Sequence, residues 1–265
     1  MVSDEGYLLD NQQAQAGIRF RALAVLFDPS TFRHLADLGV APGWRCWEVG
    51  AGGRGVPAWL AGRVGADGLV VATDIDTAWL GESDGPLQVR RHDVGLEGPP
   101  ADGLDLVHAR LVLAHVPRRE QALTSMISAL RPGGWLLLEE ADPGLQPLLC
   151  PDEHGPAERL ANRLRRGFRT LMAGRDADLA LGRTLPRLLR ERGLDDVAAD
   201  AYFPISGPAC TALEIATVEQ IRERLVAGGV ATAAEVEEHL DNLAAGRLPD
   251  LATSPLVSAW GRRRR

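Results

Sequence analysis

W-R-C-W-E-V-G-A-G-G-R-G, residues 44–55, is the stretch of this sequence that decides the fold. Residues 45–49 form a short apolar run that predicts a buried strand, with the acidic residue Glu48 near its end. Four glycines follow within the six residues 50–55, and a helical pattern of apolar residues resumes at 57–64. Because glycine adopts positive φ and lets a ligand approach the backbone, strand, glycine turn and helix together predict a binding site at a helix start.

The glycine turn is compatible with more than one ligand. The spacing Gly50-x-Gly52-x-x-Gly55 satisfies the dinucleotide pattern G-x-G-x-x-G. Together with Glu48, the same residues satisfy E-x-G-x-G, the first motif of class I S-adenosylmethionine-dependent methyltransferases. A glycine turn that binds no ligand is a third interpretation, so the rest of the chain has to distinguish the three.

Length and charge limit the class of protein. The chain has 265 residues, 45% of them hydrophobic, and a formal net charge of −7. This length and apolar content suffice for one large globular domain, and the negative charge disfavours general binding to nucleic acid. All 29 cationic side chains are arginines, and those at 262–265 are expected to form a solvated tail.

Cysteine and histidine spacing predicts neither a disulfide framework nor a metal site. The three cysteines share no close spacing, and the six histidines contain no i, i+4 pair. No apolar run reaches the roughly 20 residues that span a bilayer, and the first residues lack the apolar core of a signal peptide. We therefore expect a cytoplasmic protein, monomeric or homodimeric, whose partner is neither a membrane nor a nucleic acid.

About forty residues precede the glycine strand, and their pattern is helical. Apolar residues on one face predict a helix at 14–27, which Asp28-Pro29-Ser30 is expected to end. Ser30 can cap a second helix at 31–38, which stops at Gly39. Since a dinucleotide-binding domain often begins with its glycine strand, these preceding helices favour the methyltransferase interpretation.

Short apolar runs alternate with helical patterns through the next hundred residues. Strands are predicted at 69–73, 87–91, 104–108 and 135–139, and helices at 77–80 and 117–130. Strands that alternate with helices form a parallel sheet covered on both faces. Ligand-binding groups then gather at the carboxyl ends of the strands, where the sequence places Glu48, Asp74, Asp93 and Arg110.

The pattern changes after Asp142, where four prolines mark a loop. Helices are predicted at 157–173, 185–192, 213–227 and 233–245, and strands at 197–203 and 256–260. We interpret the additional helices as a cap on the ligand face rather than an independent domain. The prediction is a single domain, 1–265, with an N-terminal helical lid (1–40), a cofactor-binding core (41–142), a cap with strand six (143–253), and a final strand and tail (254–265).

Four segments resemble class I S-adenosylmethionine-dependent methyltransferases, in the small-molecule branch of natural-product and ubiquinone-biosynthesis-like enzymes. They are Glu48-Val-Gly-Ala-Gly52, Thr73-Asp74-Ile75, His92-Asp93-Val94 and Leu130-Arg-Pro-Gly-Gly134, and residues 109–116 are also similar to the family's segment after strand four. The resemblance implies an α/β, Rossmann-like fold with a seven-stranded, mostly parallel sheet, helices on both faces and a helical cap. Strands six and seven would form a hairpin, with strand seven antiparallel.

The resemblance also implies S-adenosyl-L-methionine as the cofactor. Its methionine portion would lie against Gly50, Ala51 and Gly52, with Glu48 at the end of the same strand. Asp74 would bind the ribose hydroxyls. From the sequence alone, Asp74 is also compatible with a role as a helix cap.

The remaining cofactor contacts follow from the later segments. By resemblance, Ile75 would pack on the adenine, and Asp93 with Val94 would hold the adenine edge. A solvated loop acid is the alternative interpretation of Asp93. Ala109 and Arg110 would line the wall near the transferable methyl group.

Three positions extend or qualify this site. Tyr7 and Arg19 are predicted to close over the cofactor from the N-terminal helix. Arg54 stands where many family members have glycine, and it would alter carboxylate binding if it projected into the site. His115 is the candidate general base because its pKa range suits proton removal near neutral pH, with a packing role as the alternative.

Methyl transfer from a sulfonium is an in-line displacement, so alignment and exclusion of water supply most of the acceleration. The predicted function is methyl transfer to an O, N or C atom of a small-molecule acceptor, which we expect to be a secondary metabolite. The alternatives are an NAD-dependent oxidoreductase, a nucleic-acid methyltransferase, and a protein that keeps S-adenosylmethionine as a structural ligand for a non-methylating step such as cyclisation.

Overall fold

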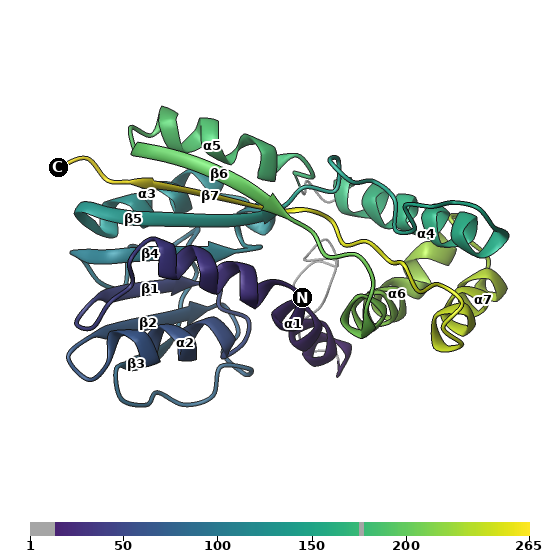
Figure 1. Cartoon of the computed structure of the whole chain (residues 1–265), viewed down its shortest axis with the longest axis horizontal. Coiled ribbons are helices and arrows are strands. Elements are labelled where there is room, and N and C mark those ends of the chain that lie inside the picture. The colour runs from purple at the N-terminus through teal and green to yellow at the C-terminus, as the bar shows by residue number, and fades with distance from the viewer. Residues whose placement is uncertain (1–13, 175–177) are drawn as a thin grey trace. The chain divides into compact units, whose positions relative to one another are not determined.

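The computed structural model describes residues 14–174 and 178–265 and contains the predicted seven-stranded sheet (Figure 1). The strand order is β3-β2-β1-β4-β5-β7-β6. The first five strands pair in parallel, and β7 is antiparallel to both β5 and β6, so the predicted closing hairpin is confirmed. The strands are β1 (Arg45–Val49), β2 (Leu69–Asp74), β3 (Leu87–Arg91), β4 (Leu104–Arg110), β5 (Leu130–Ala141), β6 (Asp195–Tyr202) and β7 (Leu256–Arg262).

Most predicted helices are present, with ends shifted by a few residues. They are α1 (Ala14–Asp37), α2 (Gly55–Val64), α3 (Arg119–Ala129), α4 (Pro156–Ala173), α5 (Leu181–Glu191), α6 (Pro208–Ala227) and α7 (Ala233–Ala244), with a 3₁₀ turn, η1 (Leu113–His115), before α3. The fifth strand is longer than predicted because residues 130–134 join it through an irregular register against β4.

Helix α1 corrects the prediction of two helices separated at Pro29. The chain remains helical through Pro29, although proline removes one intrahelical hydrogen bond and costs about 3 kcal/mol in a helix interior. Tertiary contacts on both sides of the proline offset that cost. Asp28 and Thr31 bind the Arg110 side chain, and Leu35 is fully buried against the sheet.

The helix predicted at 77–80 is absent, and a turn takes its place. The Asp76 carboxylate accepts a hydrogen bond from the Ala78 N–H at 3.0 Å, which closes a local turn instead of capping a helix. Gly81 follows at φ +71°, a conformation that ends any helical run.

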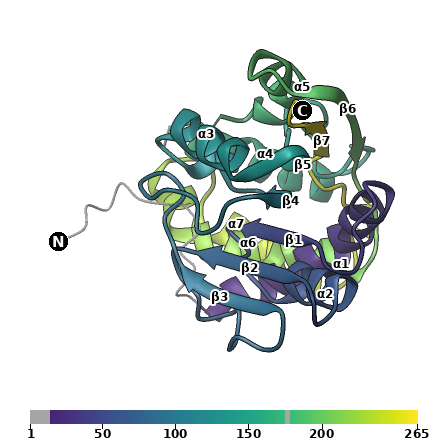
Figure 2. The same ribbon diagram turned by 90° about the vertical axis from the view of Figure 1, so that its left-hand side faces the viewer.

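Helices lie on both faces of the sheet (Figure 2), and an apolar layer separates them from the strands on each face. Side chains of α3 and α5 pack on one face, where Trp47 and Leu136 are fully buried. The end of α1 and all of α2 pack on the other face, where Leu106 and Leu137 are fully buried. Alternation along each strand sends successive residues to opposite layers, as expected for a sheet buried on both sides.

Two of the arginines at the end of the chain are tethered, so the prediction of a solvated tail was wrong for Arg262 and Arg263, whereas Arg264 is exposed. Arg262 belongs to β7, and its guanidinium lies 4.9 Å from the centre of the Trp135 ring. Arg263 donates to the Leu130 carbonyl oxygen, and Arg264 pairs with Asp195 at 3.1 Å. These contacts form because β7 lies between β5 and β6 rather than at an edge of the sheet.

The described residues divide into two compact units. The sheet unit comprises 27–141, 180–202 and 256–265, and the helical unit comprises the described parts of 14–26, 142–179 and 203–255. In the helical unit, α4, α6 and α7 pack around Leu164, Ile221 and Val236. That these helices cap the ligand face, within a single domain, stays a prediction.

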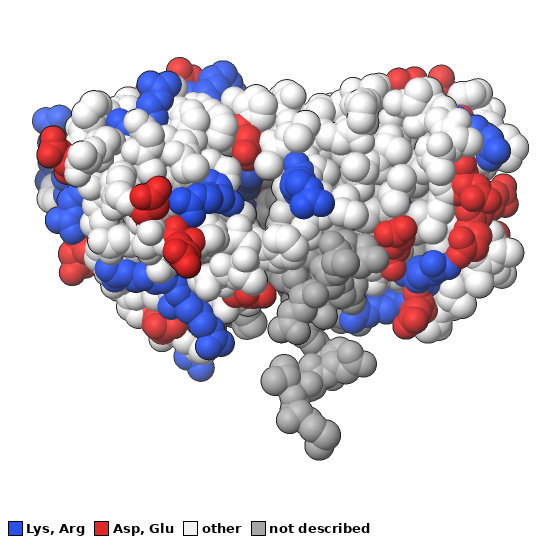
Figure 3. Space-filling model, turned by 90° about the horizontal axis from the view of Figure 1, so that it is seen from below, with Lys and Arg blue, Asp and Glu red and all other residues white. Residues whose placement is uncertain are grey.

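Charge on the surface is mixed, and no described helix is long and apolar enough to cross a membrane. Figure 3 shows arginine and acidic side chains interspersed over the face in view, as expected for a chain with a net charge of −7. All three cysteines are free and buried.

Candidate functional site

The glycine turn after β1 has the backbone geometry that the sequence predicted. Gly50 and Gly52 have φ of +59° and +60°, in the region that strongly favours glycine. A Cβ on Gly50 would lie 2.4 Å from a methyl of Val112, in the segment after β4. The turn therefore requires glycine both for its conformation and for the close approach of the next strand end.

Asp74 ties this turn to the end of β2. One carboxylate oxygen accepts from the Gly52 N–H at 2.9 Å, and the other accepts from the Asp76 N–H at 3.0 Å. The residue is 8% exposed, and burial raises the pKa of its carboxyl although these backbone N–H groups oppose the shift. Each oxygen keeps a lone pair for a further donor, so the geometry fits two adjacent hydroxyl groups of a ribose.

The ends of β2 and β3 present apolar surface beside that carboxylate. Ile75 is 61% exposed and Leu96 is 59% exposed, whereas Val94 is buried. Asp93 accepts from the Gly95 N–H at 2.8 Å, which holds the turn after β3. Exposed aliphatic side chains next to an ordered acidic turn fit a flat aromatic ring with polar edges.

Arg54 points away from this site. Its guanidinium donates to the carbonyl oxygens of Leu80 and Glu82, at 3.0 and 2.8 Å. The arginine thus links the glycine turn to the segment after β2. The altered carboxylate binding considered for an inward-pointing Arg54 does not arise.

At the end of β4, the side chains of Ala109 and Arg110 lie on opposite faces of the sheet. Ala109 is buried in the layer under α3 and α5, and its contact with the cofactor stays a prediction. Arg110 donates to Asp28 at 2.8 Å and to Thr31 at 2.9 Å. The guanidinium therefore secures α1 to the sheet, and any contact of Arg110 with a ligand stays a prediction.

The segment that carries His115 is held by a buried carboxylate from β5. Glu140 accepts from the N–H groups of Val112 and Leu113, at 2.9 and 2.6 Å. These bonds stabilise Leu111 at φ +59°, a strained conformation for a branched residue. Burial raises the Glu140 pKa to about 7, against the opposing effect of the backbone N–H groups.

His115 itself closes η1, and its N–H donates to the Val112 carbonyl oxygen at 3.0 Å. The side chain is half-buried. Its position after β4 agrees with the sequence prediction, whereas its role as a base stays a prediction.

Neither of the two predicted lid residues belongs to the described part of the sheet unit, which carries this site. Tyr7 lies outside the described residues. Arg19 is a buried residue of α1 in the helical unit, with its guanidinium 5.4 Å from the centre of the Phe20 ring. Both assignments stay predictions.

The structure brings together a row of buried polar residues that the sequence analysis did not assemble. Glu48 pairs in register with His108, and Arg110 with Glu139, so their side chains come level on the α1 and α2 side of the sheet. His108 Nδ1 lies 2.6 Å from Glu48, and its Nε2 lies 3.3 Å from Glu139. The row extends to Ser258 on β7, which donates to Glu139 at 2.7 Å.

Two side chains of α1, Thr31 and His34, extend this row. Thr31 donates to Glu139 at 2.5 Å, and His34 lies 3.3 Å from the other oxygen of the same carboxylate. His34 also contacts Asp200 on β6 at 2.9 Å. A signal was present in the sequence: Glu48, His108 and Glu139 each stand near the end of a strand, two residues after an apolar residue of the layer under α1 and α2 (Cys46, Leu106 and Leu137).

Opposite charges determine the ionisation of this row. Burial alone would lower the His108 pKa, but Glu48 and Glu139 outweigh it and raise that pKa to about 9. Burial acts in the opposite sense on Glu139, yet hydrogen bonds from His108 and His34 hold its pKa well below the usual range. His34 follows His108, since Glu139 and Asp200 overcome burial and raise its pKa.

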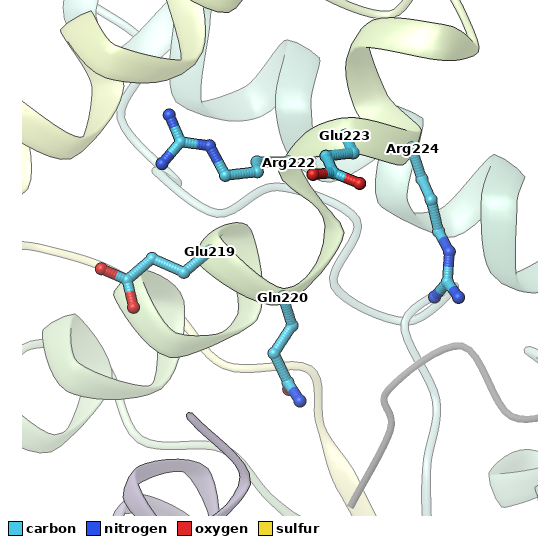
Figure 4. Close-up of a pocket in the computed structure, with 5 residues that line it drawn as sticks. All are labelled: Glu219, Gln220, Arg222, Glu223 and Arg224. Atoms are coloured by element: carbon cyan, nitrogen blue, oxygen red, sulfur yellow. The ribbon is translucent and has the colours of Figure 1, made fainter. Parts of the chain in front are cut away.

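A hollow of about 240 Å³ lies along α6 in the helical unit (Figure 4). Its described lining comes from this helix alone: Glu219, Gln220, Arg222, Glu223 and Arg224. Arg222 is paired with Glu237 of α7. No strand end contributes to this lining, and the described residues contain no cluster of three or more His, Cys, Asp or Glu that could hold a metal ion.

Comparison with known proteins identifies the family. A profile of the methyltransferase domain matches residues 15–199. Methyltransferase str2 of Strobilurus tenacellus is 34% identical over 98 residues, which cover 36% of this chain and 34% of that protein. The ubiquinone/menaquinone biosynthesis C-methyltransferase UbiE of Vibrio parahaemolyticus is 32% identical over 124 residues, 42% of this chain and 46% of that protein.

The fold agrees with these matches, although the chain spans less than half the length of the two curated relatives. Phosphoethanolamine N-methyltransferase 2 of Haemonchus contortus, solved with S-adenosyl-L-methionine, superposes with a TM-score of 0.59 at 14% identity. The superposition covers 100% of this chain and 61% of that one. At this identity, the likeness shows the fold alone.

Proposed function

The chain belongs to the methyltransferase-domain family, whose members use S-adenosyl-L-methionine, and we propose that it transfers the cofactor's methyl group to a small-molecule acceptor. The observation that carries the proposal is the arrangement of Asp74 over the Gly50–Gly52 turn, because it provides two carboxylate oxygens beside a glycine backbone that a ligand can approach closely. The predicted fold, family and cofactor agree with this arrangement.

Each strand end contributes one part of the cofactor site. Asp74 accepts hydrogen bonds from the ribose hydroxyls, and its own bonds to Gly52 and Asp76 hold it in place. Ile75 covers one face of the adenine, and the turn of Asp93 and Val94 meets its edge. The glycine turn takes the methionine portion, since a ligand can approach closely there.

The reaction asks little more of the protein than alignment. S-adenosyl-L-methionine supplies the methyl group on an electrophilic sulfonium. The protein holds the acceptor in line and excludes water, which together can supply most of the acceleration. Where the acceptor carries a proton of high pKa, His115 removes it, and Glu140 keeps the segment of His115 in position through Val112 and Leu113.

A small acceptor is favoured over a macromolecule by charge and by relatives. The net charge is −7, and Figure 3 shows the charges interspersed over the face in view. The relative from Vibrio carries the name of a quinone-biosynthesis C-methyltransferase. We propose that the methylated atom is an O, N or C atom of a secondary metabolite. We further propose that the protein is cytoplasmic and is a monomer or a homodimer.

Calorimetric titration with S-adenosylmethionine, S-adenosylhomocysteine and NAD tests the cofactor. We expect micromolar binding of the first two and no heat from NAD. Binding of NAD alone would instead identify the glycine turn as a dinucleotide-binding motif. A screen of candidate acceptors then measures the release of S-adenosylhomocysteine. An acceptor converted without that release would indicate a non-methylating reaction such as cyclisation.

Asp74→Ala tests the ribose contact. We expect cofactor affinity to fall by about 2–6 kcal/mol, because two hydrogen bonds to buried partners are lost at roughly 1–3 kcal/mol each. Asp76→Ala is the matched control, since among the described residues the Asp76 side chain accepts only from the Ala78 N–H. Equal affinity of the Asp74 variant and the wild type would remove Asp74 from the site.

His115→Gln tests the base. For an acceptor with a dissociable proton, we expect kcat to fall by about 10²–10⁴-fold and the neutral limb of the pH–rate profile to disappear. A profile identical to that of the wild type would leave His115 a packing residue.

A further inference from the structure

We propose that His108 is a positioning residue, which holds the Glu48 carboxylate in the orientation that binds the ammonium group of the cofactor's methionine portion. The inference rests on the proposed function and deepens it. It assigns a task in cofactor binding to a histidine that the sequence presents as a strand residue.

The first step is the geometry of the pair that Glu48 and His108 form. Glu48 and His108 are register partners on β1 and β4, and His108 Nδ1 lies 2.6 Å from one Glu48 oxygen, Oε2. Both side chains are buried. Among the residues that the structure describes, none donates to the second oxygen, Oε1. His108 therefore fixes one oxygen and leaves the other for a ligand.

The second step is what holds His108. Its Nε2 lies 3.3 Å from Glu139, a carboxylate that also accepts from Thr31 at 2.5 Å and from Ser258 at 2.7 Å. His34 contacts the same carboxylate at 3.3 Å. With partners from α1, β5 and β7, the imidazole is held at both nitrogens and cannot turn away from Glu48.

The third step is the place of Glu48 in the site. It lies two residues before Gly50, against which the proposed function places the methionine portion. An ammonium group needs an anion for a charge-assisted hydrogen bond. The other strand-end acids are engaged elsewhere: Asp74 spans the Gly52 and Asp76 N–H groups, and Asp93 closes the turn after β3. Glu48 is thus the acid placed for the ammonium.

The fourth step is the charge of the pair. Burial raises the pKa of Glu48, and the positive charges of His108 and Arg110 oppose the shift. His108 carries that charge at neutral pH because its pKa is raised to about 9. The charged or titratable groups around the pair, from β4, β5 and α1, are Arg110, Glu139, Asp28 and His34. A neutral side chain at position 108 removes the charge that does most to lower the pKa of Glu48 and keep it ionised.

Two substitutions separate the two nitrogens of His108. The amide nitrogen of His108→Asn takes the place of Nδ1 and keeps a donor to Glu48. The amide nitrogen of His108→Gln takes the place of Nε2, so this variant has no donor to Glu48. The probes are S-adenosylhomocysteine and 5′-methylthioadenosine, which share the nucleoside and thioether, whereas only the first carries the ammonium.

By calorimetry at pH 7.5, we expect His108→Gln to weaken S-adenosylhomocysteine binding by about 10–100-fold, as for a lost hydrogen bond to a charged group. His108→Asn should weaken it much less, and 5′-methylthioadenosine should bind all three proteins equally. A parallel loss for both ligands would make His108 a purely structural residue and overturn the inference. Unchanged S-adenosylhomocysteine binding by His108→Gln would do the same.

A pH series on His108→Asn gives an independent test if the glutamine variant does not fold. Without the imidazolium, Glu48 takes up a proton more readily, so S-adenosylhomocysteine affinity should fall from pH 8 to pH 6. Wild-type affinity should stay level over this range, and a level profile in the variant would contradict the inference. Failure of the proposed function is distinguishable, because wild-type protein would then bind neither nucleoside.

Discussion

Along β4, alternate side chains enter two layers that are stabilised by different interactions. Val107 and Ala109 join the apolar layer under α3 and α5. Leu106 begins the layer under α1 and α2, and His108 and Arg110 follow it on that side as the strand reaches its carboxyl end. The comparison shows that a fully buried face can change from hydrophobic packing to ion pairs within a few residues. That change occurs at the end of the sheet where a parallel α/β fold binds its ligand.

The two layers should respond differently to a change of charge. Glu139→Gln removes the carboxylate charge between His108 and His34 while keeping its volume. We expect a loss of about 3–5 kcal/mol in the free energy of unfolding, as for removal of one partner from a buried pair. Urea denaturation measures it, and a loss below 1 kcal/mol would show that the row is not stabilised by charge.

The neighbouring Leu138→Ala provides the matched control on the other face. Leu138 is fully buried in the apolar layer, so the cavity should cost about 2–5 kcal/mol. That loss should be the same at pH 7 and pH 9, whereas the effect of Glu139→Gln should shrink at the higher pH.

The polar layer also predicts how stability changes with pH. The His108 pKa is raised from 6.5 to about 9, so the folded state keeps a proton that the unfolded state has lost. The stabilisation is complete below pH 6.5, falls as the pH rises, and is gone above about pH 9. The slope reaches at most about 1.4 kcal/mol per pH unit for this residue, and His34 adds in the same direction.

Denaturation between pH 7 and 9 measures this slope, because the pKa of Glu140, about 7, places its titration mainly below that window. His108→Asn should flatten the curve. A wild-type stability that rises over this range would reverse the sign and refute the ion-pair interpretation.

The smallest effect is expected from charge outside the layers. Arg187 and Glu191 form an exposed i, i+4 pair on α5 at 2.8 Å. Arg187→Ala should change the free energy of unfolding by about 0.5 kcal/mol or less, because exposed pairs are screened by water and salt. A loss comparable to that of Glu139→Gln would show that burial does not explain the difference between the layers.

Local patterns in the sequence predicted the sheet and the position of the candidate site. The strand, glycine turn and helix at 45–64 and the acids at strand ends, Asp74 and Asp93, depend on neighbours in the chain. Alternation and glycine spacing carry that information directly. The same reasoning failed at Pro29, because the contacts that keep α1 continuous come from β4 and not from the adjacent sequence.

Sequence by itself thus determined the α/β architecture, the glycine turn and the strand-end acids of this protein, since each follows from residues a few positions apart. The tertiary structure alone decided what the buried polar residues do. His108 meets Glu48 across 60 positions, and Thr31 meets Glu139 across 108. Strand order and register bring these groups together, and burial then forces them to pair, because an unpaired charge in the interior is too costly to keep.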